Sequence, residues 1–324
     1  MQERYNHLNT YLKSKFGERT LKICIDGHFT CPNRDGKVGT GGCIFCSKRG
    51  AGDLINNVCS SNESDYSFIS EQVTNYFKSY RSKRANKFIA YFQNFTNTYS
   101  AISNLKKKYD AALIDERIVG LDIATRPDCI NKDVCNLLSS YQPKYSVTCE
   151  LGLQTSNDDI AKIINRGYPT STFCDAVKLL NSYNIEVVVH IMCGLPNETD
   201  QDLLDTVNCI NFLPISGIKI HSCYILKDTV LNDMYQAGTY KPLKFDEYME
   251  KLILILTHIR PDIIIHRLSA DAPKDLLVAP EWNVHKKWVL NGIEKELKER
   301  NLYQGIYYKP TIWYYYLYKC HLYN

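Results

Sequence analysis

Apolar and β-branched residues gather in short runs along this chain, and each run predicts a strand. The predicted strands cover residues 21–25, 87–92, 118–124, 145–153, 185–193 and 217–226. Several segments between them carry apolar residues three or four positions apart, which is the spacing of an amphipathic helix. These predicted helices cover residues 67–80, 158–165, 171–183 and 200–213. The alternation indicates an α/β fold built from βα units around a parallel sheet.

Six such units favour a partial (β/α)6 barrel of the TIM-like kind, with a doubly wound sheet as the alternative. After residue 227 the pattern changes to a predicted helix over 244–259, a predicted strand over 262–269 and a predicted helix over 281–300. We therefore expect three parts. They are an N-terminal segment at 1–20, the barrel at 21–227, and a small C-terminal α/β extension at 228–324 that closes one side of the barrel.

The composition is that of a folded, soluble protein, with 23% charged and 44% hydrophobic residues among 324. The chain has no run of 18 apolar residues that would cross a membrane, and its polar first 20 residues do not resemble a secretory signal. We therefore expect a cytoplasmic protein without membrane partners. Most of the 13 cysteines lie in apolar runs, and Cys24, Cys149, Cys193 and Cys223 are interpreted as reduced thiols of the core.

Three basic runs raise the question of a nucleic-acid partner, because the net charge of +4 is too small to indicate one. The runs lie at 78–87, 105–108 and 285–288, and they could form either a phosphate-facing surface or ordinary solvated helix faces. The tail at 307–324 is crowded with tyrosine. It could be a packed aromatic patch or a stacking surface for bases.

Three cysteines follow the first predicted strand in a glycine-rich loop, with the spacing C-x11-C-x2-C at Cys31, Cys43 and Cys46. With His28 as a fourth ligand they could hold a structural zinc ion. They could equally hold a [4Fe-4S] cluster, which three thiolates would leave with one open iron. The loop lies at the carboxyl end of a strand, where barrels assemble their chemistry, and this position favours the iron-sulfur cluster.

Several motifs, taken in order, resemble those of the radical S-adenosylmethionine (SAM) superfamily. The resemblance is to its elongator-catalytic-subunit-like branch, and within that branch to the bacterial YtqA/YhcC-type group. The motifs are the cysteine loop at 31–46, YFQNFTNTY at 91–99, GLDIATRPDC at 120–129, ELGLQTSND at 150–158 with NRGY at 165–168, HIMCGLPNET at 190–199, and HRLSADAPKDLLVAPEW at 266–282. The resemblance implies that a [4Fe-4S] cluster binds SAM and that one electron splits it, which gives a 5′-deoxyadenosyl radical.

The resemblance also implies roles for particular residues. Cys31, Cys43 and Cys46 would be the cluster ligands. The residues that would contact SAM or line its site are Gln154, Arg166, Glu150, Gly194, Leu195, Pro196, Tyr91 and Gln93. Glu150 could instead form a salt bridge with a lysine. Arg267 and Asp271 of the C-terminal motif are further candidates for the site. Ala124 occupies the position where the elongator-type pattern has a glutamate.

The implied function is modification of the C5 side chain of a wobble uridine in tRNA, with tRNA and a flavodoxin- or ferredoxin-type one-electron reductant as partners. The basic runs and the tyrosines support a nucleic-acid substrate. A second reading keeps the radical chemistry and replaces tRNA with a small metabolite. A third reading is a zinc-stabilised binding module without catalysis, in which His28 would be a ligand.

Overall fold

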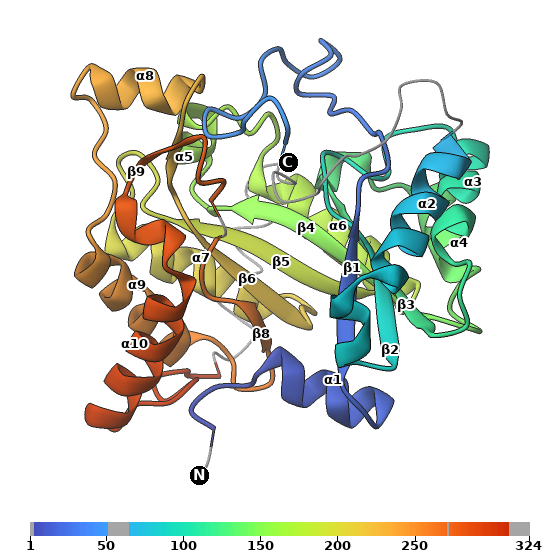
Figure 1. Cartoon of the computed structure of the whole chain (residues 1–324). Coiled ribbons are helices and arrows are strands. Elements are labelled where there is room, and N and C mark those ends of the chain that lie inside the picture. The colour runs from blue at the N-terminus through green and yellow to red at the C-terminus, as the bar shows by residue number, and fades with distance from the viewer. Residues whose placement is uncertain (1–2, 51–64, 271, 311–324) are drawn as a thin grey trace.

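A curved parallel sheet forms the centre of the molecule in the computed structural model, which describes residues 3–50, 65–270 and 272–310. The sheet has seven strands in the order β1-β2-β3-β4-β5-β6-β8 and curls into a half-barrel (Figure 1). Its strands are β1 (Thr20–Ile25), β2 (Lys87–Phe92), β3 (Ile118–Thr125), β4 (Ser146–Gln154), β5 (Glu186–Cys193), β6 (Gly217–Ser222) and β8 (Ile264–Arg267). A small antiparallel pair joins β7 (Ile225–Leu226) to β9 (Leu277–Ala279).

Helices connect the strands and cover the outer face of the half-barrel (Figure 1). The α-helices are α1 (Leu8–Phe16), α2 (Asp65–Lys78), α3 (Ile102–Ala112), α4 (Lys132–Ser139), α5 (Asp158–Ile163), α6 (Thr170–Ser182), α7 (Asp200–Phe212), α8 (Val230–Gln236), α9 (Phe245–His258) and α10 (Lys286–Glu299). Three 3-10 helices are η1 (Tyr80–Arg84), η2 (Pro127–Cys129) and η3 (Glu281–Val284). No helix in the described ranges is long and apolar enough to cross a membrane.

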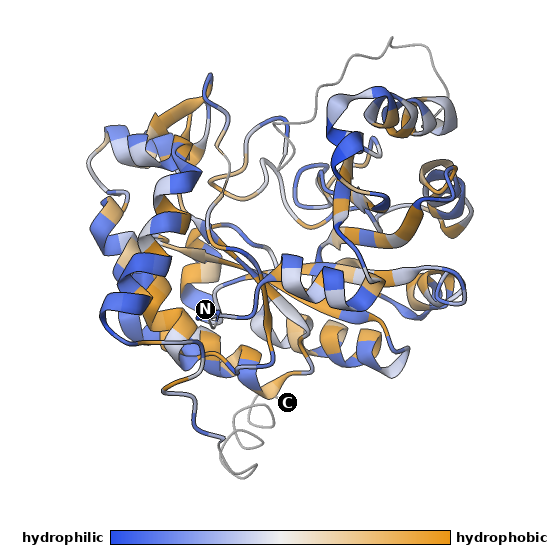
Figure 2. Ribbon diagram, turned by 60° about the horizontal axis from the view of Figure 1, so that its bottom comes forward, coloured by the Kyte–Doolittle hydropathy of each residue, from blue (hydrophilic) through white to orange (hydrophobic). Residues whose placement is uncertain are grey.

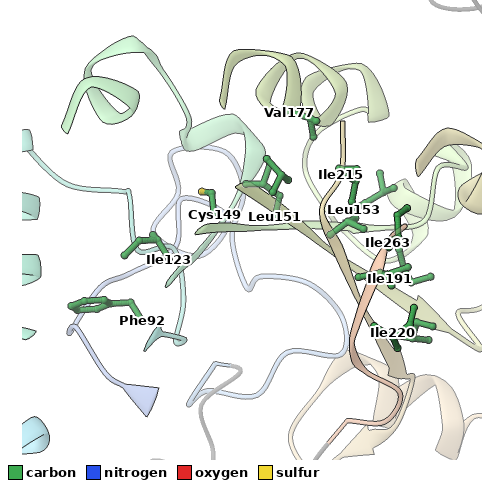
Figure 3. Packing of buried hydrophobic residues seen from close by; sticks show 14 of the residues in the cluster. Phe92, Ile123, Cys149, Leu151, Leu153, Val177, Ile191, Ile215, Ile220 and Ile263 are labelled. Carbon is green, nitrogen blue, oxygen red and sulfur yellow. The ribbon is translucent and has the colours of Figure 1, made fainter. Parts of the chain in front are cut away.

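The hydrophobic core lies between the outer face of the sheet and the helices. Alternate residues of each strand face opposite ways, so Ile23 and Ile25 of β1 point to the helices and are buried, while Lys22 and Cys24 point inside the half-barrel. Phe92, Ile123 and other buried residues fill this layer (Figure 3). Figure 2 shows the corresponding pattern of hydrophobic strands and helices with hydrophilic outer faces.

Two sequence predictions need correction. The apolar run 217–226 is not one strand, because β6 ends at Ser222 and the next two strand residues, Ile225 and Leu226, pair with β9. The run 262–269 is not separate from the barrel either, because its β8 pairs in parallel with β6 and makes the sheet seven-stranded. Its apolar residues Ile264 and Ile265 are buried there. The predicted boundaries at residues 20 and 227 stay predictions.

The half-barrel is open between β1 and β8, which form the two ends of the strand order. Helix α1 contacts both of these strands, and the backbone N–H of Ile265 donates to the carbonyl of Asn6 at 2.8 Å. The N-terminal segment therefore crosses one end of the gap (Figure 1). The rest of the gap leaves the interior of the half-barrel accessible, and this interior holds the candidate site.

Candidate active site

A cavity of about 380 Å³ opens at the carboxyl ends of the strands, and all three cysteines of the loop line it. The loop is fixed by polar contacts rather than by regular structure. Arg34 Nη2 donates to the carbonyl of Cys46 at 3.2 Å, and Asn33 Nδ2 donates to the carbonyl of Asn165 at 2.6 Å. These contacts tie the loop to itself and to the segment after α5, so that the thiols of Cys31, Cys43 and Cys46 face one space.

The donor set suits an iron-sulfur cluster. Burial and, to a smaller extent, the neighbouring thiols of Cys46 and Cys31 raise the pKa of Cys43 to about 12. Buried thiols that lie near one another lose their protons only when a cation, such as the iron of a cluster, binds to them. Asn33 Nδ2 lies 3.8 Å from Cys43 Sγ and can donate to that sulfur. Across the described part of the chain, no group of three His, Cys, Asp or Glu side chains is already arranged so that it could hold a metal ion.

The structure places His28 away from this thiol set. Its ring stacks on Phe68 at a centroid distance of 3.6 Å, and His28 is not among the residues that line the cavity. The fourth ligand of the zinc hypothesis therefore does not face the three cysteines.

Gln154 lines the cavity at the end of β4. A register shift between Gly152 and Gln154 interrupts the pairing with β5, and Gln154 takes a left-handed backbone conformation with φ of 59°. The hydroxyl of Tyr168 donates to the carbonyl of Gly152 at 2.7 Å and supports this irregular turn. A bulge of this kind re-aims a side chain, and here it directs Gln154 at the cavity.

Arg166 lies elsewhere than the resemblance led us to expect. It is 1% exposed and does not line the cavity. Its Nη1 donates to the carbonyls of Leu153 and Thr155, both at 2.6 Å, and its Nη2 contacts Asp158 at 3.0 Å. Burial lowers the pKa of Arg166. The guanidinium of Arg166 thus stabilises the end of β4 through these hydrogen bonds. Its direct contact with SAM stays a prediction, which this geometry does not favour.

The turn Gly194–Leu195–Pro196 follows β5, and none of its residues lines the cavity. Gly194 has φ of 86°, and a Cβ there would lie 2.8 Å from Cγ of Leu243, so glycine is required. The backbone N–H of Gly194 donates to Glu198 at 2.7 Å. The expected contact of this turn with adenine stays a prediction.

Glu150 lies 1% exposed in the middle of the barrel; its expected salt bridge with a lysine is confirmed, and its contact with SAM stays a prediction. It lines the cavity, and it also forms salt bridges with Lys22 at 2.8 Å and with Lys219. His190 Nε2 lies 2.8 Å from Oε2 of Glu150, the oxygen that Lys219 also contacts, whereas Lys22 contacts Oε1. The sheet register explains the cluster, because His190 of β5, Lys219 of β6 and the next strand's Arg267 are aligned partners.

The electrostatics of this cluster depend on burial. Burial alone would raise the pKa of Glu150, but Lys219, Lys22 and His190 outweigh it and hold that pKa well below its usual value. Burial lowers the pKa of Lys219 to about 7, although Glu150 opposes the shift. Burial likewise lowers the pKa of His190 to about 4. The carboxylate of Glu150 therefore stays ionised while the basic groups around it are poorly solvated.

Sequence reasoning missed Lys22, Lys219 and His190, because each is a single charged residue inside an apolar run. Cys24 was interpreted wrongly: it is exposed and lines the cavity, whereas Cys149, Cys193 and Cys223 are buried as expected. The reason is its position on the inner face of β1, at the open edge of the sheet. The alternation around Ile23 and Ile25 was the signal that could have identified this face.

Of the remaining predicted residues, some line the cavity and others lie outside the described part of the chain. Tyr91, Gln93 and Arg267 line the cavity, and the hydroxyl of Tyr91 accepts from Lys219 Nζ at 3.0 Å. Ala124 lines it too, at the position of the missing glutamate. Asp271 and most of the tyrosine-rich tail, 311–324, lie outside the described residues.

Comparison with known proteins agrees with this arrangement. The model of the radical SAM superfamily matches residues 35–210, and that of the Radical_SAM C-terminal domain matches 215–299. The protein YtqA of Bacillus subtilis is 37% identical over 95% of this chain and 94% of its own length. Protein YhcC of Escherichia coli is 30% identical over 96% of this chain and 98% of its own.

A solved structure gives the same fold. The archaeal Elp3 of Methanocaldococcus infernus superposes with a TM-score of 0.64 at 17% identity, over 88% of this chain and 64% of that one. The sequence comparison, the fold comparison and the position of the three thiols at the mouth of the half-barrel therefore all indicate the same family. The chain belongs to the radical SAM superfamily, in its Elp3-like branch, whose members use a [4Fe-4S] cluster and SAM.

Proposed function

We propose that this radical SAM enzyme modifies the C5 side chain of a wobble uridine in tRNA. When bound, the reduced cluster and SAM would together supply a 5′-deoxyadenosyl radical that removes a hydrogen atom from the substrate. Cys31, Cys43 and Cys46 would hold the cluster, and Gln154, Tyr91 and Gln93 would contact SAM or the base from the cavity wall. A flavodoxin- or ferredoxin-type protein in the cytoplasm would deliver the electron.

The observation that carries the proposal is the lining of the cavity, which is basic and aromatic. Its arginines are Arg34, Arg81, Arg126 and Arg267, and its aromatic side chains besides the histidines are Phe45, Tyr91, Phe95, Tyr168 and Tyr224. Glu150 is the one carboxylate among the lining residues that the structure describes, and two lysines already neutralise it. Cations that meet phosphates and rings that stack on bases are the features by which proteins bind an unpaired nucleotide.

The surface near the cavity supports the same substrate class. The basic run 78–87 forms the end of α2 and η1, where Tyr80 is 78% exposed and Arg81 reaches the cavity. The run 105–108 contributes less than its sequence suggests, because Lys108 is buried and donates to the carbonyl of Gly27. A splayed-out anticodon base could therefore enter between charged and aromatic side chains on the η1 side.

The deciding experiment incubates the anaerobically reconstituted enzyme with SAM, a reductant and bulk tRNA. We expect 5′-deoxyadenosine and an altered nucleoside to appear together, and neither to appear with a Cys31→Ala variant. Formation of 5′-deoxyadenosine with no change in any tRNA nucleoside would contradict the tRNA proposal. Metabolite pools from cells with and without the protein would then identify a small-molecule substrate.

A further inference from the structure

Two cysteines that the candidate site does not use lie on neighbouring helices outside the sheet. Cys174 belongs to α6 and Cys209 to α7, and both are present as thiols. Cys174 is 8% exposed and is part of the main hydrophobic cluster, against which Cys209 packs. Cys209 is only partly buried, so small solutes reach the two sulfurs from its side. We call these two residues the helix thiol pair.

Hydrogen bonds to one residue fix the two helices at the same level. The hydroxyl of Thr170 in α6 donates to the carbonyl of Ser156 at 3.1 Å, and the backbone N–H of Ser156 donates to the hydroxyl of Thr206 in α7 at 2.9 Å. The helices run in the same direction, because α6 leads to β5, α7 leads to β6, and those strands are parallel. Cys174 follows Thr170, and Cys209 follows Thr206, by about one helical turn. The two thiols therefore face each other.

A contact between the two side chains agrees with this geometry. The thiol of Cys209 donates a hydrogen bond to Cys174, and this bond lowers the pKa of Cys174. Burial opposes the shift, the positive charge of Lys178 supports it, and the negative charges of Asp175 and Asp158 oppose it. Cys174 thus combines thiolate character with a second thiol beside it. Cysteines in this arrangement are the ones that peroxides oxidise to disulfides.

A second pair of close cysteines lacks this character. The backbone N–H of Cys223 donates to the carbonyl of Cys193 at 2.8 Å, so these residues are also neighbours. Cys193 is 0% exposed and Cys223 is 3% exposed. Burial raises the pKa of both thiols, that of Cys223 to about 12. They are a matched control within the same chain, because they are close together but stay protonated.

We propose that the helix thiol pair is a redox modification site, at which a peroxide oxidises Cys174 and Cys209 then closes a disulfide between α6 and α7. In the first step the Cys174 thiolate attacks an oxygen of hydrogen peroxide, the O–O bond breaks, and a sulfenic acid and hydroxide form. In the second step the Cys209 sulfur attacks the sulfenic sulfur, the S–O bond breaks, and the Cys209 proton leaves with the hydroxyl as water. Two electrons pass from the sulfurs to the peroxide. The inference does not depend on the substrate proposed above.

The disulfide would lie close to the support of Gln154. Thr170, about one turn before Cys174, accepts a hydrogen bond from Nη2 of Arg166 at 3.2 Å. Arg166 in turn donates to the carbonyls on either side of Gln154. A bridge at the helix thiol pair therefore ties the helix that carries Thr170 to α7.

Thiol mapping tests the proposal. The cluster-loaded protein is treated with hydrogen peroxide at pH 7, the remaining thiols are alkylated, and peptide mass spectrometry measures each one. We expect a disulfide between Cys174 and Cys209, which dithiothreitol reverses, to form about tenfold faster than Cys193 or Cys223 is oxidised. Diamide is used in parallel, because iron released from a cluster would decompose peroxide, and it should give the same bridge. Unbridged Cys174 with both oxidants, or its disulfide with another cysteine, would overturn the proposal.

Variants separate the roles of the two thiols. In Cys209→Ser the hydroxyl keeps a donor beside Cys174 but supplies no second sulfur, so dimedone should trap a sulfenic acid on Cys174. Cys174→Ser should give no such adduct on Cys209. The opposite labelling would contradict the assigned roles.

Two exposed residues of α6 provide variants that leave both thiols in place. Lys178→Met should slow oxidation of Cys174 about threefold, whereas Asp175→Asn should not slow it, because the two charges act on the pKa of Cys174 in opposite directions. Equal slowing in both variants would show that the thiolate character of Cys174 does not direct the reaction.

Discussion

Glu150 organises the interior of this protein from a single position. Its carboxylate receives Lys22 from β1, Lys219 from β6 and His190 from β5, three strands that are distant in sequence. Removing one partner of a buried ion pair costs more than the pair itself contributes, because the remaining charge stays desolvated. The cluster is therefore a structural requirement as well as part of the cavity wall.

Glu150→Gln tests this requirement. The amide keeps the shape but leaves Lys219 without a counter-charge, so we expect the free energy of unfolding to fall by about 3 kcal/mol. Urea denaturation with matched circular dichroism would measure it. Asp159→Asn is the control, because the Asp159–Lys162 pair is on the surface and its loss should leave the unfolding midpoint unchanged. An equal effect of the two variants would contradict the role of Glu150.

His221 gives a pH-dependent prediction. Burial, with His190 and Arg267, holds its pKa well below 6.5, and its Nε2 has no hydrogen-bond partner among the described residues. Below about pH 6.5 the unfolded chain takes up a proton there and the folded protein does not. Relative to His221→Gln, the wild type should lose up to roughly 1.4 kcal/mol of stability for each unit by which the pH falls below 6.5.

Urea unfolding of both proteins at a series of pH values measures that difference. If the His221→Gln and wild-type stabilities ran parallel with pH, His221 would not be held neutral by the fold.

At the scale of elements, the end of β4 is the part of the site that depends most on its support. Gln154 has a left-handed backbone conformation between Leu153 and Thr155, and Arg166 bonds the carbonyls of both neighbours. Arg166 acts on the cavity through this strand end rather than by reaching it. Another arginine, Arg260, stabilises the segment before β6 in the same way, because it donates to the carbonyls of Asn211, Leu213 and Ile215.

Arg166→Gln and Arg260→Gln are therefore a matched pair. Each should lower the unfolding free energy by about 2 to 4 kcal/mol, because each leaves buried carbonyls without donors. Only Arg166→Gln should also raise the KM for SAM, by about tenfold with a smaller change in kcat, since it loosens the turn that carries Gln154. Thermal melts and steady-state kinetics of 5′-deoxyadenosine formation separate the two effects. Unchanged KM values in both variants would assign Arg166 a purely structural role.

For the whole molecule, the half-barrel keeps an open side because β1 and β8 do not pair, and the cysteine loop stands at the same mouth. We predict that the three thiols hold one iron-sulfur cluster. Cys31→Ala, Cys43→Ala or Cys46→Ala should each abolish the visible absorbance and most of the iron of the anaerobically prepared protein. Cys209→Ser on α7 should retain both. Retention of iron in any of the loop variants would exclude that residue as a ligand.

The basic surface at η1 gives a prediction for RNA binding. Replacing Arg81, Lys83 and Arg84 with glutamine should weaken tRNA binding and lower the slope of log affinity against log salt by about 2 to 3. The control replaces Lys295, Lys298 and Arg300 of the α10 region, on another side of the molecule. Filter binding across a salt series measures both. Equal effects of the two triple changes would show that binding is not directed to the cavity.

The sequence alone determined the parallel α/β core, six of the seven strands of its sheet, and the cysteine loop. The reason is that these features depend on near neighbours: apolar runs form strands, and a C-x2-C spacing brings two sulfurs together within one turn. The motif resemblance added the family. None of this required knowing which strands lie side by side.

The tertiary structure alone decided the rest. The place of β8 in the sheet, the exposure of Cys24, the bracing role of Arg166, and the meeting of Lys22, Glu150 and Lys219 all follow from strand order and register. A lysine in an apolar run gives no local sign of its partner, because the partner lies on a strand more than a hundred residues away. Only when the sheet forms do these charges face one interior, where burial shifts the pKa of Lys219 and gives the site its character.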